Sequence, residues 1–392
     1  MATRQPVVAV FVGTRADLGP LTPVLTALRA APDLTLRVFT GVMYAAHGLA
    51  AVLPGPTTVE EWAESIVPLA LPMDQVDAEH QVEQGALLGA ATGRALRQLD
   101  VDVLVALGDR WELLYVVPPA VLLGVPVVHL HGGEVTEGAL DERVRHAVTK
   151  LADQHCVASE DAARRVRQLG EPADRVHVTG APGLDRLAAA ERMTDAELAV
   201  VSGLPRIERP VALFTYHPPT THDPAQAGPW AREAAEATLD ECGTVIATHP
   251  GMDVGREGVL AALEEVAQCH ADRFVVVEAL GREYPRALAS VDVVVGNSSS
   301  GVIEAATVHV PAVDVGDRQQ GRLRGDNVLH AEEGRAAVAA AVRAALGPEW
   351  HERVQATVNP YGDGKAAPRI LDIVREAVGG DRVKEFVDLE EQ

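Results

Sequence analysis

Short apolar runs alternate with longer amphipathic stretches along most of the chain. The apolar runs are rich in valine, and the stretches between them repeat Ala, Leu and Arg with helical spacing. In the first half we predict buried strands at Val7–Val12, Leu36–Thr40, Val101–Leu107, Val125–Leu130, Gln154–Ala158 and Arg175–Thr179, and helices at Leu21–Ala31, Gln81–Leu99, Glu112–Leu123, Glu142–Ala152 and Glu160–Leu169. This alternation predicts a mainly parallel, doubly wound sheet.

The pattern pauses near Ala188–Arg209 and then restarts. Further strands are predicted at Val211–Thr215, Val245–Thr248, Phe274–Glu278, Val291–Gly296 and Ala312–Val315. Because 392 residues are too many for one ordinary core, we expect an α/β fold of two Rossmann-like domains, 1–188 and 189–365, which face a central cleft.

The end of the chain carries one more predicted helix, Ala366–Val378. We expect the segment 366–392 to pack back on the first domain, with an acidic, solvated tail after Gly380. Ligand sites in such folds lie where the carboxyl ends of parallel strands meet. The loops that follow the strands are therefore the places to search.

The net charge and the cysteines of the chain restrict the classes of partner and the compartment that we expect. A formal net charge of −22 repels phosphate backbones and anionic lipids, which argues against a nucleic-acid or membrane partner. A small phosphorylated ligand remains compatible, since helix N-termini and a few arginines act locally. No stretch approaches the roughly 20 apolar residues of a membrane span. Cys156, Cys242 and Cys269 form no CxxC pair, which suggests reduced thiols in a cytoplasmic protein.

Two loops of the first domain carry candidate chemistry. The loop 13–19 lacks both the GxGxxG fingerprint and the GK[ST] of a P-loop. Its Arg15 can reach a diphosphate at a helix N-terminus, or be a surface arginine after a tight turn. Asp109 and Arg110 follow the predicted strand that ends at Leu107. Asp109 suits acid/base work on a sugar, but capping of the helix that starts near Trp111 is the favoured reading of Asp109 alone.

The next loop and helix hold further carboxylates. His129 and His131 are two residues apart and share a strand face, as some metal ligands do, but nothing nearby completes a set and we expect no metal. Glu134 follows two glycines that allow close backbone approach. Asp141 and Glu142 begin a helix, with Asp141 a natural N-cap. The number of carboxylates on this one segment favours acid/base chemistry.

Strand ends in the second domain also carry polar residues. His217 and His249 each precede a proline at a strand end, and a role in the cleft is expected for at least one of them. A Gly/Ser loop then opens a helix and is typical of a phosphate site, with a Ser-capped helix as the structural alternative. Its candidate ligand contacts are Asn297, Ser298, Ser299, Ser300 and Gly301, with Glu304 for ribose hydroxyls and Arg318 on the next loop.

Taken together, these segments resemble one known family. GTRADLGPL, GDR, HLHGGEVTEGALDERVRHAVTKLAD, TYHPPT, GNSSSGVIEA, DRQQGR and NPYGDG occur in the order seen in UDP-N-acetylglucosamine 2-epimerases, over roughly residues 7 to 375. The stretch from GGE to TK and the ending RQxGR are similar to the hydrolysing branch. The non-hydrolysing branch typically carries HxEAGxR in the corresponding loop, and this chain does not.

The resemblance implies a glycosyltransferase-B-type fold without metal or cofactor, and often a homodimer or homotetramer. The implied reaction is anti-elimination of UDP from UDP-N-acetylglucosamine through 2-acetamidoglucal, followed by hydration to N-acetylmannosamine. By motif position, Asp109, Asp141 or Glu142, and His217 match acid/base residues, while Arg15, Ser298, Ser299, Glu304 and Arg318 match UDP-binding residues. Some members have a catalytic glutamate at the position of His131, whereas other relatives have histidine. Whether His131 or Glu134 takes that role is open.

Three other functions remain compatible with the sequence. A non-hydrolysing epimerase would interconvert UDP-N-acetylglucosamine and UDP-N-acetylmannosamine. A glycosyltransferase of the same fold would need an acceptor and would not need the carboxylates between Asp109 and Glu142. A sugar-nucleotide sensor with a decayed site would bind UDP without turnover. The exact hexosamine, including one for a specialised aminosugar product, is also open.

Overall fold

The computed structural model describes residues 4–41, 49–50, 53, 59–70, 78–136, 140–219, 222–251, 254–381 and 383–388, without the side chains of Arg15, Ala16 and Ala78. The chain divides into two compact units, Met1–Asp185 with Gly364–Gln392, and Arg186–Asp363. No helix in the described part of the chain is long and apolar enough to cross a membrane.

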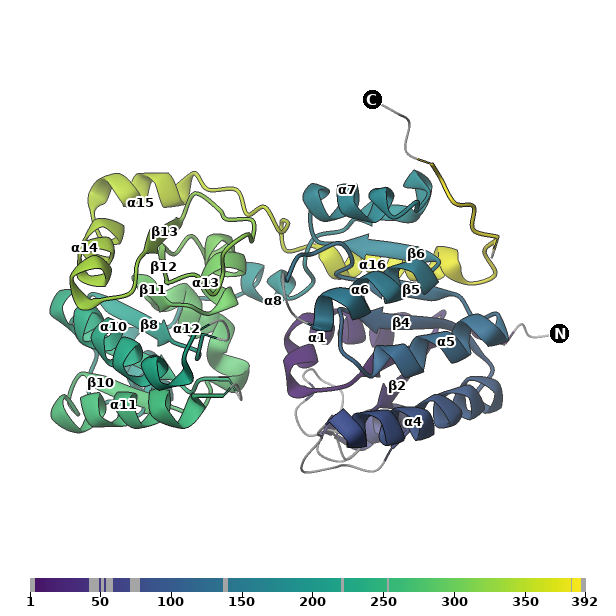
Figure 1. The fold of residues 1–392 in the computed structure, drawn as a ribbon, viewed down its shortest axis with the longest axis horizontal. Coiled ribbons are helices and arrows are strands. Elements are labelled where there is room, and N and C mark those ends of the chain that lie inside the picture. The colour runs from purple at the N-terminus through teal and green to yellow at the C-terminus, as the bar shows by residue number, and fades with distance from the viewer. Residues whose placement is uncertain are drawn as a thin grey trace. The chain divides into compact units, whose positions relative to one another are not determined.

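Unit 1 is built around a parallel sheet of seven strands in the order β3-β2-β1-β4-β5-β6-β7 (Figure 1). Its strands are β1 (Val7–Val12), β2 (Thr35–Thr40), β3 (Ile66–Pro68), β4 (Val101–Leu107), β5 (Val127–Leu130), β6 (Gln154–Val157) and β7 (Val176–Val178). Its helices are α1 (Arg15–Ala30), α3 (Val59–Ser65), α4 (Ala78–Gln98), α5 (Leu113–Leu123), α6 (Leu140–Leu151), α7 (Glu160–Gln168) and α16 (Ala366–Ala377), and α8 (Leu184–Ala188) lies where the chain passes into unit 2.

The two faces of this sheet form separate cores. One core joins the strands to α1 and α16, with Leu25 and Ile370 fully buried. The other joins them to α4, α5 and α6, through residues such as Leu88, Val116 and Val148. The returning α16, yellow in Figure 1, is therefore an integral layer of unit 1.

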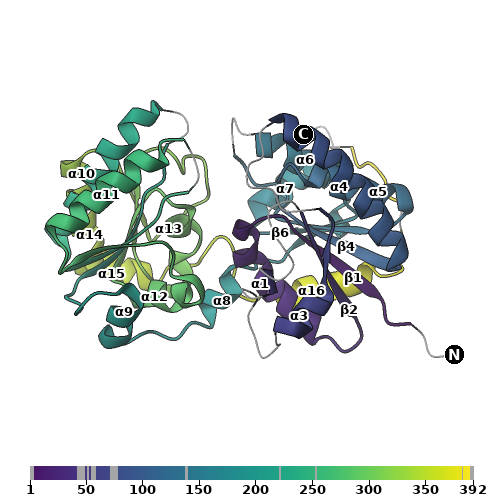
Figure 2. The same ribbon diagram turned by 90° about the horizontal axis from the view of Figure 1, so that it is seen from below.

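Unit 2 repeats the same design with a six-stranded parallel sheet in the order β10-β9-β8-β11-β12-β13. Its strands are β8 (Val211–Thr215), β9 (Thr244–Thr248), β10 (Phe274–Val277), β11 (Val293–Gly296), β12 (Ala312–Val315) and β13 (Val328–Ala331). Its helices are α9 (Asp195–Ser202), α10 (Ala227–Glu241), α11 (Arg256–Cys269), α12 (Tyr284–Ser290), α13 (Ser299–Ile303), α14 (Arg335–Ala345) and α15 (Pro348–Gln355). Helices α10, α11 and α14 cover one face of the sheet, and α9 and α12 lie on the other (Figure 2).

Both sheets therefore have the strand order of a Rossmann fold, 3-2-1-4-5-6, and the predicted two Rossmann-like halves are confirmed. The strand order reverses between β1 and β4 in unit 1 and between β8 and β11 in unit 2. In open parallel sheets the loops at the carboxyl side of this reversal form the ligand crevice. The central cleft itself stays a prediction.

The predicted elements differ from the observed ones mainly at their ends. Helix α1 begins at Arg15 rather than Leu21, although Pro20 and Pro23 lie inside it. Its start is fixed by Asp17, whose carboxylate accepts the backbone N–H groups of Gly13 and Thr14, each at 2.8 Å. The strands β3 and β13 were not predicted, because their short runs include polar or proline residues.

The prediction of a solvated tail is wrong for Lys384. Its ammonium group donates to the carbonyls of Lys150 and Ala152, each at 2.7 Å, and lies 3.0 Å from the carboxylate of Glu171. Glu171 is fully buried and also pairs with Lys150 and with His155. Burial raises the pKa of Glu171, but the hydrogen bonds from His155, Lys150 and Lys384 outweigh it and lower the pKa to about 2.

We predict that Lys384→Met destabilises the protein, because it removes one cation from a buried carboxylate. A loss of about 1–3 kcal/mol in the free energy of unfolding is expected. Since the folded-state pKa of Glu171 lies below its usual value of 4.5, its contribution is present above pH 4.5 and is lost as the pH falls towards about 2. Thermal unfolding at several pH values should therefore show that the difference in Tm between the wild type and Lys384→Met becomes smaller as the pH falls.

The matched control is Arg192→Met, which removes an exposed cation from unit 2. An equal loss of Tm in both variants, or a gap that does not change with pH, would contradict the buried pairing of Lys384 with Glu171.

Candidate active site

The polar residues of unit 1 gather around one buried arginine, Arg145 on α6, which is 2% exposed. One guanidinium nitrogen donates to the carbonyl of Glu134 at 2.6 Å and to the carboxylate of Glu142 at 2.9 Å. The other donates to the hydroxyl of Thr136 at 2.8 Å and to the carboxylate of Asp109. A single side chain thus joins the loop after β4, the loop after β5 and the first turn of α6.

Arg145 was not among the residues selected from the sequence. It lies in the RHA part of the motif on α6, three residues after Glu142. The sequence signal that could have indicated its role is an arginine on the same helical face as the acidic residues of the first turn. A surface salt bridge explains that spacing equally well, so burial was needed to reveal its role.

Asp109 does not cap α5, so the favoured structural reading of this residue is wrong. Helix α5 begins at Leu113 and has no side-chain cap at Glu112, whereas Asp109 accepts from Arg145. Arg110 lies 3.5 Å from the carboxylate of Glu112, which is buried. Burial raises the pKa of Glu112, and the charge of Arg110 only partly opposes this. The loop therefore presents Asp109 to α6 and directs Arg110 towards Glu112.

The acids at the start of α6 differ in their proton affinity. The helix begins at Leu140, so Asp141 lies within its first turn rather than at the predicted N-cap position. Burial and then the charge of Asp109 raise the pKa of Asp141. Burial also raises the pKa of Glu142, but the N–H of Thr136 at 2.6 Å and the charge of Arg145 outweigh it and lower the net pKa. The pKa values of two adjacent carboxyl groups are thus shifted in opposite directions.

His129 and His131 do not share a strand face, because β5 ends at Leu130 and His131 turns away with φ 61°. His129 is fully buried, with Nε2 2.8 Å from the carbonyl of Gly108. Burial lowers the pKa of His129 to about 3, so it is a neutral structural residue. Within the described part of the chain, no three or more His, Cys, Asp or Glu residues are grouped to hold a metal.

His131 instead pairs with Glu134, with 2.5 Å between Nδ1 and the carboxylate. Burial lowers the pKa of His131, but the charges of Glu134 and Asp109 outweigh it and raise the net pKa. The structure therefore brings Asp109, His131, Glu134, Asp141 and Glu142 into one electrostatically coupled group.

In unit 2 the loop after β8 is held by Asn297, which is fully buried. Its amide oxygen accepts the backbone N–H of His217 at 2.6 Å, and its amide nitrogen donates to the carbonyl of His217 at 2.8 Å. Strands β8 and β11 pair with Gly296 opposite Thr215, and a Cβ at Gly296 would lie 2.0 Å from the Thr215 carbonyl. The side chain of Asn297 therefore holds the backbone of His217 in place.

The imidazole of His217 has a defined tautomer. Its Nδ1 accepts the backbone N–H of Gly251 at 2.8 Å, so a proton on the neutral ring must lie on Nε2. Gly251 is two residues beyond His249, whose own Nδ1 lies 3.5 Å from Arg256. The two His-Pro loops predicted to be equivalent are thus joined by a hydrogen bond.

The serine loop forms the N-terminus of α13, which starts at Ser299 as predicted. Ser298 caps the helix, accepting from the backbone N–H of Ser300 at 3.4 Å, and the two hydroxyls are 3.0 Å apart. Gly301 is buried, and a Cβ there would lie 3.5 Å from side chains of Val294 and Ala312, so this glycine packs on the sheet.

Glu304 lies just after α13 and accepts from the hydroxyl of Tyr284 at 2.6 Å. Burial raises its pKa. Arg318 follows β12 and reaches the carbonyl of Asn297 at 3.4 Å. The side chain of Arg15 lies outside the described residues.

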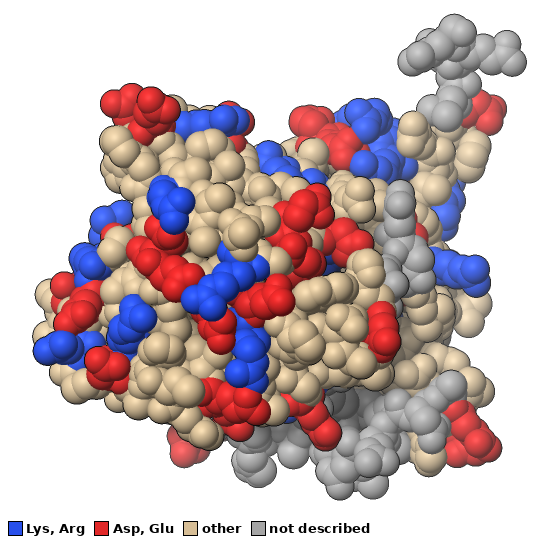
Figure 3. Space-filling model, turned by 60° about the vertical axis from the view of Figure 1, so that its left-hand side comes forward, with Lys and Arg blue, Asp and Glu red and all other residues tan. Residues whose placement is uncertain are grey.

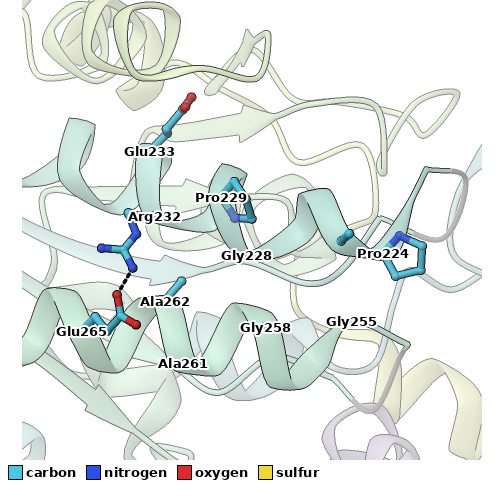
Figure 4. Close-up of a pocket in the computed structure, with 11 residues that line it drawn as sticks. Pro224, Gly228, Pro229, Arg232, Glu233, Gly255, Gly258, Ala261, Ala262 and Glu265 are labelled. Carbon is cyan, nitrogen blue, oxygen red and sulfur yellow. Dashed lines mark hydrogen bonds and ion pairs between the residues drawn. The ribbon is translucent and has the colours of Figure 1, made fainter.

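A separate hollow of about 420 Å³ lies between α10 and α11 (Figure 4). Gly228 and Gly258 in its lining let the two helices approach closely there, since a Cβ on Gly228 would lie 2.8 Å from the Gly258 carbonyl. Among the described residues of its lining, the one cation, Arg232, is neutralised in an ion pair with Glu265, and the remaining charged side chain, Glu233, is acidic. This hollow therefore lacks the free charge that a phosphorylated ligand requires.

The chain is similar in sequence to known nucleotide-sugar epimerases. The family model of UDP-N-acetylglucosamine 2-epimerase matches residues 65–375. A UDP-N,N'-diacetylbacillosamine 2-epimerase (hydrolyzing) from Legionella pneumophila is 32% identical over 366 residues, which are 93% of this chain and 94% of that protein. A UDP-N-acetylglucosamine 2-epimerase from Neisseria meningitidis is 31% identical over 325 residues, 82% of each chain.

A solved structure supports the fold. The UDP-GlcNAc 2-epimerase from Neisseria meningitidis bound to UDP-GlcNAc matches with a TM-score of 0.70 at 16% identity, over 95% of this chain and 100% of that one. At this identity the likeness shows the fold alone, and it confirms the predicted glycosyltransferase-B type. Since the family model spans most of the sequence and the Legionella relative covers nearly all of it, the chain belongs to the UDP-N-acetylglucosamine 2-epimerase family of nucleotide-sugar epimerases.

Proposed function

We propose that this protein is a hydrolysing UDP-N-acetylglucosamine 2-epimerase, which converts UDP-N-acetylglucosamine and water to N-acetylmannosamine and UDP. The proposed route is anti-elimination of UDP to 2-acetamidoglucal, followed by hydration. The observation that carries the proposal is the group of carboxylates held by Arg145, in which the pKa of Asp141 is raised and that of Glu142 is lowered.

This group fits the chemistry of the proposed reaction. The proton at C2 of the sugar is weakly acidic, so its removal needs a placed base, and its return needs a group that holds a proton at neutral pH. Neighbouring groups with opposite pKa shifts supply both functions. We assign the acid/base work to Asp109, to Asp141 or Glu142, to His131 or Glu134, and to His217.

The leaving group requires stabilisation of diphosphate charge. For this role we propose Arg15, Arg110, Ser298, Ser299, Ser300 and Arg318, with His249 and with Glu304 for the ribose. Asn297 and Gly301 contribute by holding the loops in place, since Asn297 bonds the backbone N–H and carbonyl of His217 and Gly301 packs on the sheet.

The sugar can differ from N-acetylglucosamine. The Legionella relative is named for the hydrolysing epimerisation of UDP-N,N'-diacetylbacillosamine. Both nucleotide sugars are therefore substrates to test, and the one with the higher kcat/KM is the substrate of this enzyme.

NMR of the reaction in deuterated water tests the function directly. We expect free UDP and N-acetylmannosamine to form from UDP-N-acetylglucosamine, with deuterium at C2. A product that keeps its UDP would instead identify a non-hydrolysing epimerase. Release of UDP without deuterium at C2 would exclude epimerisation, and binding of UDP without any product would indicate a sensor.

Replacement of Asp109 tests the acid/base group. Asp109→Asn keeps the shape of the side chain but removes the charge beside Arg145, and should lower kcat by roughly 10²–10⁴-fold. Steady-state kinetics should show this loss, while Asp372→Asn, an exposed change on α16, should leave kcat as it is. Unchanged turnover in Asp109→Asn would favour a glycosyltransferase instead.

We also propose that the protein is a homo-oligomer through α4 and α5. Apolar side chains on these packed helices are exposed, among them Leu87 at 62% and Leu122 at 86%. The double variant Leu87→Glu/Leu122→Glu should be monomeric by light scattering, because charge on an apolar interface opposes association. Val200→Glu on α9, where Val200 is 82% exposed, is the control. A wild-type monomer would refute the proposal.

A further inference from the structure

The pair formed by His131 and Glu134 has a defined proton arrangement. The 2.5 Å contact joins Nδ1 of His131 to a carboxylate oxygen of Glu134. An ionised carboxylate only accepts hydrogen bonds, so Nδ1 carries the proton. In the neutral ring, Nε2 is then an unprotonated nitrogen with an available lone pair.

That Nε2 atom is buried and has no hydrogen-bond partner among the described residues. Buried polar atoms without a partner are rare in folded proteins, because each loses its hydration without compensation. A ring whose one nitrogen is tightly held and whose other is unused is arranged as in carboxylate–imidazole pairs that transfer protons.

The backbone of the loop enforces this arrangement. His131 has φ 61°, a left-handed conformation that a non-glycine residue adopts infrequently. Gly133 follows with φ 77°, and a Cβ there would lie 2.2 Å from the carbonyl of Ala162. From α7, Arg165 also donates to the carbonyl of Gly133 at 3.1 Å. The loop therefore fixes the orientation of the His131 ring at a cost in backbone strain, and such strain is often found at functional sites.

Charges from each neighbouring element act on this ring. Glu134 in its own loop and Asp109 after β4 favour the imidazolium, while Arg145 on α6 opposes it, and His129 on β5 is neutral. Burial lowers the pKa of His131, but the two carboxylates outweigh it, so the net pKa is raised. A base of raised pKa suits the removal of a weakly acidic carbon proton.

We propose that His131 and Glu134 form one catalytic dyad, in which Nε2 of His131 removes the C2 proton of the sugar and Glu134 is the positioning residue that orients the ring. This inference rests on the proposed function. The C2–H bond breaks and an N–H bond forms at Nε2, the C–H electron pair becomes the C1=C2 double bond, and the C1–O bond breaks with its electrons leaving on UDP. The positive charge of the resulting imidazolium is then compensated by the negative charge of the Glu134 carboxylate.

The first test is His131→Gly, a substitution that the backbone accepts because glycine adopts φ 61° without strain. We expect UDP release and C2 deuterium exchange to fall by roughly 10²–10⁴-fold, and added imidazole to restore at least about tenfold of the lost rate by occupying the space of the missing ring. His309→Gly is the matched control, since His309 also has a positive φ, 53°, and lies in unit 2. It should retain its rate and not respond to imidazole.

The second test is Glu134→Gln, whose amide oxygen still accepts from Nδ1 but carries no charge. Because Glu134 raises the pKa of His131, its neutralisation should move the acidic limb of the kcat/KM profile to lower pH. A purely structural pair would change KM or stability without moving this limb.

The outcomes separate the two proposals. Wild-type protein that neither releases UDP nor exchanges the C2 hydrogen overturns the proposed function, and the dyad with it. If His131→Gly keeps the turnover rate of the wild type, the dyad is overturned while the proposed function stands. Loss of turnover without rescue by imidazole, together with an unmoved limb in Glu134→Gln, also overturns the dyad.

Discussion

The buried guanidinium of Arg145 is the interaction on which the candidate chemistry of unit 1 depends. Arginine cannot lose its proton in a protein, so its removal from water must be balanced by acceptors. Here the acceptors are two carboxylates, one carbonyl and one hydroxyl, drawn from three separate segments. Removing one partner of a buried charge typically costs about 3–5 kcal/mol. The constraint therefore fixes the position of Asp109 relative to the first turn of α6 more firmly than either loop could by itself.

In unit 2 the loop that carries His217 is held mainly by hydrogen bonds from a neutral side chain, that of Asn297. The strand order of this unit is that of unit 1, and its loops also emerge where that order reverses. The side chain of Asn297 bonds to both backbone groups of His217, and Gln319 bonds the carbonyl of Asn297 at 2.9 Å. Apart from Arg318, which also reaches the carbonyl of Asn297 at 3.4 Å, this clamp consists of neutral groups. On the face shown in Figure 3, acidic and basic side chains are interspersed, so the net charge of −22 is not concentrated there.

The sequence was sufficient for the two-domain plan and for the strands other than β3 and β13, because most buried parallel strands here are continuous valine-rich runs. It was insufficient wherever a long side chain selects its partner through tertiary contact. Arg145 resembles an exposed helical arginine until its burial is known, and Asp109 resembles a helix cap until Arg145 is placed. Lys384 lies in an acidic segment that predicts solvation, yet it meets Glu171, more than two hundred residues earlier in the chain. The prediction that His129 and His131 share a strand face was wrong for a local reason, because β5 ends at Leu130, between the two residues.

The character of His131 follows from the charge around it. Asp109, Glu134, Asp141 and Glu142 already bring four carboxyl groups to this site, and Arg145 pairs with those of Asp109 and Glu142. A fifth carboxyl group would raise the proton affinity of its neighbours by repulsion, and fewer of them would be ionised at neutral pH. An imidazole in that place has the opposite effect, because its protonated form compensates Glu134 and its neutral form adds no charge. A histidine can thus take part in proton transfer here, beside an Asp141 whose pKa is raised by burial and by the charge of Asp109 and a Glu142 whose pKa is lowered by its hydrogen bonds and by the charge of Arg145.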